Sequence, residues 1–300
     1  MELLYIRLAS LIILSLVYML FDVFNKRNIP SVFVYASVGY GFLLTLLYLN
    51  ITTILYSSAM ALLVLGGGYM LYRAGQLGAA DVTEFAALSL ILPMQISPLL
   101  YHIPQFNLPF LLSMLINTGI IAFVITAIYY LPKAKLTSKA PLTKSIPRTN
   151  IIKALAIGIS YTAFLVMLVY FFGVYVPGVS LVILLLATSM LIILFEKPIT
   201  STMISYVDYK KFESGDIIAM NLMSAKEIES ARRKIRKFDR LVNDSLINEM
   251  KAKRVTMKFP VYKKAMPLAL PIFVGVCISL LFGDLLLFIV PFTISLLAFA

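Results

Sequence analysis

Runs of mostly apolar residues fill most of this chain, and each run is long enough to cross a lipid bilayer as one helix. A membrane-spanning helix needs about 20 consecutive apolar residues, and about eight such runs occur. They lie near residues 3–21, 31–49, 52–72, 82–100, 108–131, 151–172, 177–195 and 267–283. The chain is 61% hydrophobic and only 13% charged, which is too apolar for a soluble globular protein. The sequence therefore predicts an all-α polytopic membrane protein.

The first and the last apolar stretches of the chain each allow more than one interpretation. The first run, 3–21, has the hydropathy of a secretory signal, but no small-residue cleavage site follows it, so we expect a retained transmembrane helix. A further apolar stretch, 285–299, is short and contains Pro291. This stretch is therefore compatible with three structures, namely a ninth helix, a re-entrant segment or an interfacial segment.

The basic residues predict the orientation, because the cytoplasmic loops of membrane proteins carry an excess of Lys and Arg. If the first residues lie outside, then of the 26 Lys and Arg residues only Arg7 falls on the outer half. We therefore expect a multi-pass plasma-membrane protein whose basic loops face the cytoplasm. The net charge of +12 follows from this topology, so a nucleic-acid partner is not expected.

The polar stretches divide the chain into segments. The expected segments are a membrane core over 1–131, a basic cytoplasmic loop over 132–150, an additional transmembrane pair over 151–196, a cytoplasmic insertion over 197–265, and a C-terminal transmembrane helix and tail over 266–300.

The insertion has a pattern of its own. We expect a turn at residues 213–216, a short strand-like segment at 217–220 and then one long amphipathic helix. The apolar residues of that helix recur at helical spacing, and they are Ile228, Ile235, Phe238, Val242 and Leu246. Its other face is basic, so we expect it to lie beside anionic lipid headgroups, with a substrate-gathering role as the alternative.

Acidic residues are rare in the first two thirds of the chain. Before Glu196 there are only Glu2, Asp22, Asp81 and Glu84, and the last three are expected at the cytoplasmic rim of the membrane. An ionisable side chain costs about 2.5–3.5 kcal/mol at the bilayer centre and less at the rim, so a functional role is the leading explanation.

Each of these acids also has a purely structural explanation. Asp81 and Glu84 have the spacing of a helix N-terminal capping box. Asp22 fits a solvated residue at a helix end.

Metal and thiol chemistry find little support in the sequence. Cys277 is the one cysteine and His102 the one histidine. A single cysteine excludes an internal disulfide and a zinc site built from cysteines, and His102 alone is not expected to form a metal centre or a catalytic triad. We therefore expect neither a metal nor a cofactor.

Two segments resemble the aspartate motifs of archaeal preflagellin and prepilin peptidases, which are membrane aspartyl proteases related to the type IV prepilin peptidases and share a Gly-x-Gly-Asp motif with presenilins. Asp22 precedes the basic segment Asn25-Lys26-Arg27-Asn28-Ile29-Pro30, like the first motif of the family. Gly78-Ala79-Ala80-Asp81 is similar to the second motif. The segment after the insertion, from Pro267 to Asp284, is similar to the last helix of the family, and Asn117 matches a polar position.

The chain also departs from the family pattern. Ala80 replaces the second motif glycine, which is compatible with the motif if the backbone there keeps a negative φ, and Thr83 stands where a Lys is common. The helix pair in 151–196 is an addition to the usual six helices. A cysteine-rich zinc domain and a methyltransferase segment are absent, so the resemblance implies cleavage without N-methylation.

The resemblance implies that Asp22 and Asp81 are catalytic, with Gly78, Ala79 and Ala80 forming the motif around Asp81. Two adjacent carboxyls cannot both ionise comfortably, so we expect them to share a proton. One then activates a water molecule and the other protonates the leaving amine, with the assignment between them open. The implied substrates are pilin-like or archaellin precursors, cut after a short basic leader at the cytoplasmic membrane face. Glu84 either binds the positive charge of the leader or caps the helix.

Two other classes stay open. A protease of the presenilin or signal-peptide-peptidase kind has an element similar to Ala269-Leu270-Pro271, but its aspartates lie on late helices rather than on the first and fourth. A transporter or a non-enzymatic scaffold is the other alternative, and a transporter should show inverted repeats with broken helices at mid-membrane.

Overall fold

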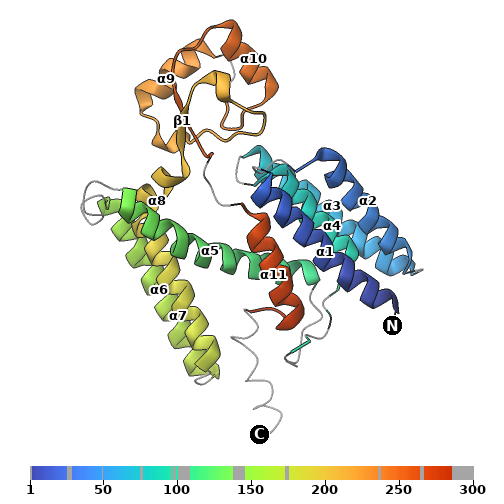
Figure 1. Cartoon of the computed structure of the whole chain (residues 1–300). Coiled ribbons are helices and arrows are strands. Elements are labelled where there is room, and N and C mark those ends of the chain that lie inside the picture. Colours follow the sequence, from blue (N-terminus) through green and yellow to red (C-terminus); the bar gives the residue numbers. More distant parts are fainter. Residues whose placement is uncertain are drawn as a thin grey trace.

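The fold was obtained as a computed structural model, and it consists of a helical membrane part with a small separate body at one end (Figure 1). The structure describes residues 2–25, 29–48, 50–74, 77–94, 96, 99–100, 109–137, 146–172, 176–235, 238–263 and 267–285. Lys26 to Asn28 of the first aspartate motif and His102 lie outside the described residues.

Each predicted apolar run contains a helix. These helices are α1 (Glu2–Phe24), α2 (Ser31–Leu46), α3 (Ile51–Arg73), α4 (Ala79–Ile91), α5 (Phe110–Thr137), α6 (Arg148–Phe172), α7 (Val176–Leu194) and α11 (Ala269–Leu281), with α8 (Glu196–Met203) following α7. Helix α4 ends well before residue 100, because Leu92 precedes Pro93 and takes the non-helical angles φ −132° and ψ 88°.

The lengths of these helices bear on the number of membrane crossings. Among the described residues, four helices are long and apolar enough to cross a bilayer, or five if α7 and α8 form one span bent by 74°. Helix α11 has 13 residues, and at 1.5 Å per residue it covers about 20 Å, less than the bilayer core of about 30 Å. The all-α membrane fold is thus confirmed, whereas eight or nine crossings are not. The stretch that was open for a ninth helix lies almost wholly outside the described residues.

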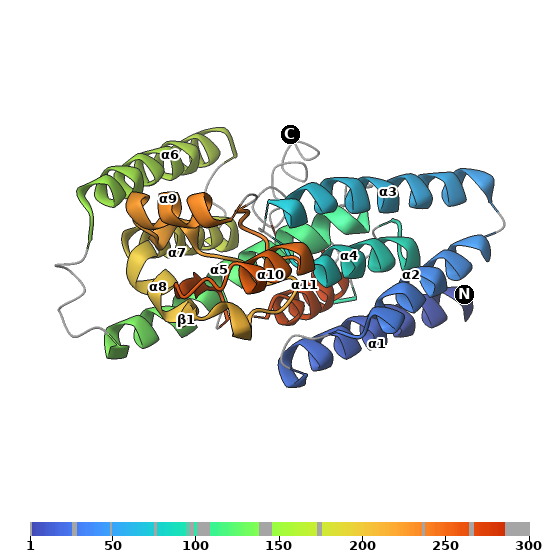
Figure 2. The same cartoon turned by 90° about the horizontal axis from the view of Figure 1, so that it is seen from above.

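Helix α4 lies at the centre of the bundle and packs against α1, α2 and α3, while α11 packs between α1 and α5 (Figures 1 and 2). The shared core contains Phe85 and Leu88 of α4, Met114 of α5 and Val276 of α11, all buried. Small residues let these helices approach closely, as is usual in membranes. A Cβ atom at Gly41 of α2, for example, would lie 2.9 Å from the Ala87 carbonyl oxygen of α4.

The buried Arg7 joins three helices at the end of the bundle away from the insertion. From α1 it donates to the carbonyl oxygens of Ile91 in α4, at 2.8 Å, and of Leu44 in α2. Its guanidinium also lies 3.6 Å from the centre of the Tyr48 ring. Cations favour helix C-termini, so this arginine holds the ends of α2 and α4 together.

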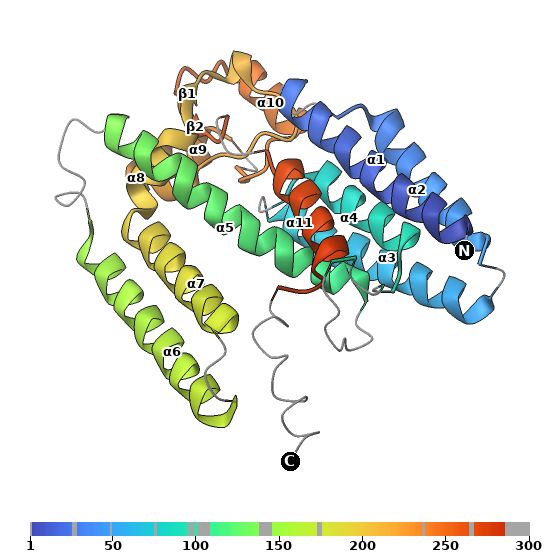
Figure 3. The same cartoon turned by 60° about the horizontal axis from the view of Figure 1, so that its bottom comes forward.

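Helix α5 runs obliquely from the bundle to a second group of helices (Figure 3). It contacts α7 and α8 there, and α6 packs on α7. Helix α5 continues through Pro132 to Thr137, so the boundary predicted at residue 131 falls inside a helix. Membrane helices tolerate such prolines because neighbouring groups satisfy the freed backbone atoms.

The insertion between α8 and α11 folds around its own hydrophobic core. Strands β1 (Ser205–Val207) and β2 (Phe259–Val261) pair antiparallel, with Tyr206 opposite Pro260. The other elements are the 3-10 helices η2 (Tyr209–Lys211) and η3 (Met220–Leu222), and helices α9 (Ala225–Lys234) and α10 (Asp244–Ala252).

The insertion contains the expected turn, whereas the expected strand-like segment forms only isolated bridges. A turn is present at 213–216, where the Asp216 N–H donates to the Glu213 carbonyl at 3.1 Å and Gly215 has φ +96°. Ile217 and Ile218 of the strand-like segment form only isolated bridges, to Leu241 and Val261.

The single long amphipathic helix predicted for the insertion is wrong, because the segment forms two helices. Ile235 is extended, with φ −121° and ψ 120°, and ends α9. The Asn243 side chain then accepts the Leu246 N–H at 2.8 Å and starts α10. Ile235, Phe238, Val242 and Leu246 are buried in the core of the insertion. These residues therefore pack within protein rather than form a stripe along one helix.

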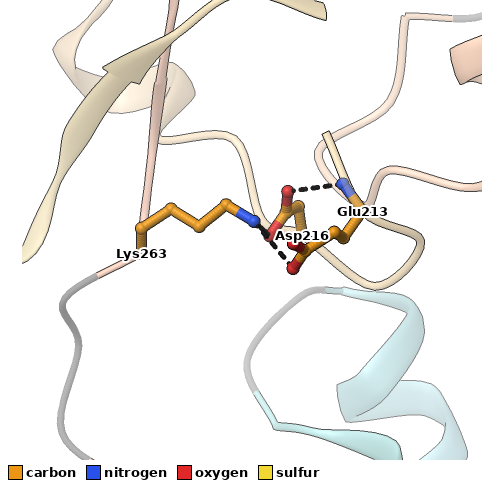
Figure 4. A network of polar contacts seen from close by, with 3 residues as sticks. All are labelled: Glu213, Asp216 and Lys263. Atoms are coloured by element: carbon orange, nitrogen blue, oxygen red, sulfur yellow. Dashed lines mark hydrogen bonds and ion pairs between the residues drawn. The ribbon is translucent and has the colours of Figure 1, made fainter. Parts of the chain in front are cut away.

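A polar network holds the point where the chain leaves the insertion toward α11 (Figure 4). The Lys263 ammonium lies 3.0 Å from Glu213 Oε2 and 2.9 Å from Asp216 Oδ1. The other oxygen of Asp216 accepts the Glu213 N–H at 2.9 Å. The start of the return segment is thereby tied to the turn at 213–216.

Candidate active site

Asp22 lies in the last turn of α1 and is only 7% exposed. Its Oδ2 atom accepts the N–H of Ala269 at 3.1 Å. Ala269 is the first residue of α11, where unpaired N–H groups and the helix dipole favour a carboxylate. The solvated helix-end explanation for Asp22 is therefore wrong, because this side chain is buried against the start of another helix.

Asp81 lies in the first turn of α4 and is half-buried. Its Oδ2 atom accepts the N–H of Gly78, the residue just before the helix, at 3.0 Å. A Cβ atom at position 78 would lie 2.7 Å from this oxygen. A side chain there would push the carboxylate of Asp81 aside, which gives Gly78 a physical role.

The capping box proposed for Asp81 and Glu84 is wrong in its register, because the N-cap residue is Gly78 and the acid at the third helical position is Asp81, which takes a capping role by accepting the Gly78 N–H. Helix α4 begins at Ala79, before Asp81, and Asp81 itself bonds to the backbone that precedes the helix. Glu84 lies in the interior of the helix and makes no bond to its start. Glu84 therefore needs another explanation.

The structure brings the two aspartates together. Helices α1 and α4 pack against each other, and Asp22 and Asp81 are close enough to interact electrostatically. Both lie at the end of the bundle that faces the insertion, where α11 begins (Figure 1). Two neighbouring carboxyls whose charges interact can hold different protonation states, which acid and base catalysis requires.

Ala80 fits its position beside Asp81. It belongs to helix α4, and among the described residues only Arg254 combines a side chain with a positive φ. The condition set for alanine at the motif position is thus fulfilled. Ala80 packs against the buried cluster of Tyr18, Val34 and Ala269, which joins α1, α2 and the start of α11. Ala79 is exposed at the helix start.

Glu84 is the most isolated of the acidic residues near the site. Its side chain is fully buried, and neither carboxyl oxygen has a hydrogen-bond partner. It interacts electrostatically with Asp81 and with Asp22. Among the described residues, no group of three or more acidic, cysteine or histidine side chains is arranged to hold a metal ion.

Sequence reasoning missed Tyr18, which lies one helical turn before Asp22. Its ring is fully buried, and its hydroxyl is 2.7 Å from the Ser37 Oγ of α2. The same hydroxyl interacts with Thr83 of α4. Tyr18 thus links three helices directly beneath the aspartates. The spacing of four residues from Asp22 was the available signal, because such residues share one helix face.

Asn117, singled out by its resemblance, lies away from the aspartates. Its Nδ2 donates to Ser279 Oγ and to the Gly283 carbonyl, both at 2.8 Å, and its Oδ1 accepts the Leu285 N–H at 3.0 Å. The residue therefore fastens α5 to the C-terminal end of α11.

Comparison with known proteins adds one match. Residues 9–131 match the family model described as the type IV leader peptidase family, and this segment contains Asp22, Asp81 and Glu84. No curated protein and no solved structure matches the chain. The matched segment is thus similar to the type IV leader peptidases, which indicates a membrane protease that resembles the prepilin peptidases.

Proposed function

We propose that this protein is a membrane aspartyl endopeptidase that removes the short basic leader from type IV pilin-like or archaellin precursors. The observation that carries the proposal is that Asp22 and Asp81 lie close enough to interact electrostatically. They come from packed helices inside the segment that matches the peptidase family. The expected location is the plasma membrane, with the site at the cytoplasmic face.

The proposed chemistry uses the two carboxyls as a pair with one shared proton. The ionised carboxyl takes a proton from a water molecule, whose oxygen attacks the scissile carbonyl carbon. The protonated carboxyl donates a hydrogen bond to the carbonyl oxygen and then passes its proton to the leaving amine. The N–H groups of Gly78 and Ala269 each hold one oxygen of a carboxyl and so orient the two side chains.

The position of the aspartates supports cleavage at the membrane face. Asp22 lies in the last turn of its helix and Asp81 in the first turn of its helix. A precursor whose leader ends where its apolar helix begins presents its scissile bond at that depth.

A second candidate is a protease that cuts within the bilayer, as presenilin-like enzymes do. The observation in its favour is that Ala269, of the Ala269-Leu270-Pro271 element, lies against Asp22. The position of the cut separates the two candidates.

The test is a cleavage assay with this enzyme in membranes and a panel of pilin and archaellin precursors, with the products analysed by mass spectrometry. We expect one cut just before the apolar helix of the precursor. A cut inside the apolar helix would favour the second candidate. The absence of any cut across the panel would contradict the proposal.

A further inference from the structure

The buried carboxyl of Glu84 has no partner that explains its presence. Both of its oxygens are shielded from solvent and accept no hydrogen bond. Buried polar groups are normally hydrogen-bonded, and an unpaired acid inside a helix bundle is costly. Since Glu84 does not cap α4, its place in the fold calls for a ligand rather than for a structural role.

The surroundings of Glu84 indicate which chemistry would complete it. Its electrostatic neighbours are Asp81, Asp22 and Tyr18, of which two are acids and one is a phenol. Among the described residues, every ion pair lies in the insertion, and Arg7 is committed to carbonyls at the other end of α4. A buried carboxyl that accepts no hydrogen bond and has acidic neighbours is matched by a cationic group on the substrate.

We infer that Glu84 binds the charged head of a Lys or Arg in the basic leader of the substrate, an inference that rests on the proposed function. Glu84 lies three residues after Asp81, so the two share a helix face and are about 4.5 Å apart along the helix axis. Asp81 is half-buried, and Glu84 lies beneath it. A long Lys or Arg stem passes apolar surface while its head reaches a charged partner.

Burial makes this contact selective. A site built to pair with a charged or polar group rejects a substrate that lacks it, because the buried partner is then left unsatisfied. We expect the enzyme to prefer Lys over Gln at this substrate position by about 10- to 100-fold in kcat/KM, within the range for desolvated charge pairs. Glu84 is thus a specificity-determining residue.

The test compares two forms of a precursor that differ only in Lys or Gln at the basic leader position closest to the cut. Each form is cleaved by the wild type, by Glu84→Gln, which keeps the size and removes the charge, and by Glu84→Asp, which keeps the charge. Glu229→Gln is the matched control, because Glu229 is an exposed acid in the insertion. Initial rates give kcat/KM for every pair.

The expected result is that the wild type and Glu229→Gln prefer Lys, Glu84→Asp keeps part of the preference, and Glu84→Gln loses the preference because its rate on the Lys form falls more than its rate on the Gln form. An unchanged preference in Glu84→Gln, or an equal loss on both substrates, would overturn the inference and leave Glu84 a structural role. If the wild type cuts neither form, the proposed function itself fails.

Discussion

Position 80 shows how a single methyl group fits beside the candidate dyad. Ala80 replaces a glycine of the family motif, yet the helical backbone needs no special conformation there. Its side chain packs against the buried cluster formed by Tyr18 of α1, Val34 of α2 and Ala269 of α11. Ala80, next to Asp81 in the chain, therefore packs where α4 approaches the start of α11.

Substitutions at position 80 test this packing. Ala80→Gly should keep cleavage activity and lose no more than about 1 kcal/mol of stability through helix propensity. Ala80→Leu adds bulk at the meeting point, so it should lose about 1–3 kcal/mol and most of the cleavage rate. Thermal unfolding in detergent and the precursor cleavage rate measure both effects. Full activity in Ala80→Leu would show that the space around Ala80 is unimportant.

At the scale of elements, α11 couples the insertion to the membrane core. It starts at the contact with Asp22 and ends at the contacts of Asn117. Along its length it packs closely on α5, where a Cβ atom at Gly275 would lie 2.8 Å from the backbone nitrogen of Thr118. Backbone atoms cannot rotate away, so a larger residue at position 275 must shift α11. That shift would also move the N–H of Ala269, which donates a hydrogen bond to Asp22.

Gly275→Ala should therefore destabilise the protein by about 1–3 kcal/mol and slow cleavage. Gly119→Ala is the matched control, because a Cβ atom there meets nothing within 4 Å and the change should cost nothing or add up to about 1 kcal/mol. Chemical unfolding and cleavage rates of both variants give the comparison. Equal behaviour of the two variants would show that the α5–α11 contact is loose.

For the whole molecule, the sequence predicts the helical membrane fold and the two aspartates, but not the contacts that join distant segments. Asp22 and Ala269 are separated by 247 positions, and no local pattern indicates that they touch. The insertion was assigned one long helix because its apolar spacing continues through the loop between α9 and α10. Spacing records which residues are buried, whereas the backbone at Ile235 and Asn243 decides where helices stop and start.

The predicted orientation of the whole molecule is open to labelling with a membrane-impermeant maleimide. Replacing Cys277 by Ser removes the one cysteine, and Ser214 and Asn50 are exposed positions at the insertion and at the loop before α3. We expect Ser214→Cys to react only in inside-out vesicles and Asn50→Cys only in intact cells, because basic segments stay in the cytoplasm. The reverse pattern would place the aspartates on the outer face and contradict the proposed location.

The most direct test of the account is the cleavage rate of purified enzyme in proteoliposomes, on a precursor that the wild type cuts, for Asp22→Asn and Asp81→Asn. Asp244→Asn, in the exposed first turn of α10, is the control for loss of a charge. Loss of a catalytic acid or base costs at least about 100-fold in rate, so each dyad variant should fall that far while the control keeps its rate and all three unfold at similar temperatures. A rate within tenfold of wild type in either dyad variant would contradict the two-aspartate mechanism.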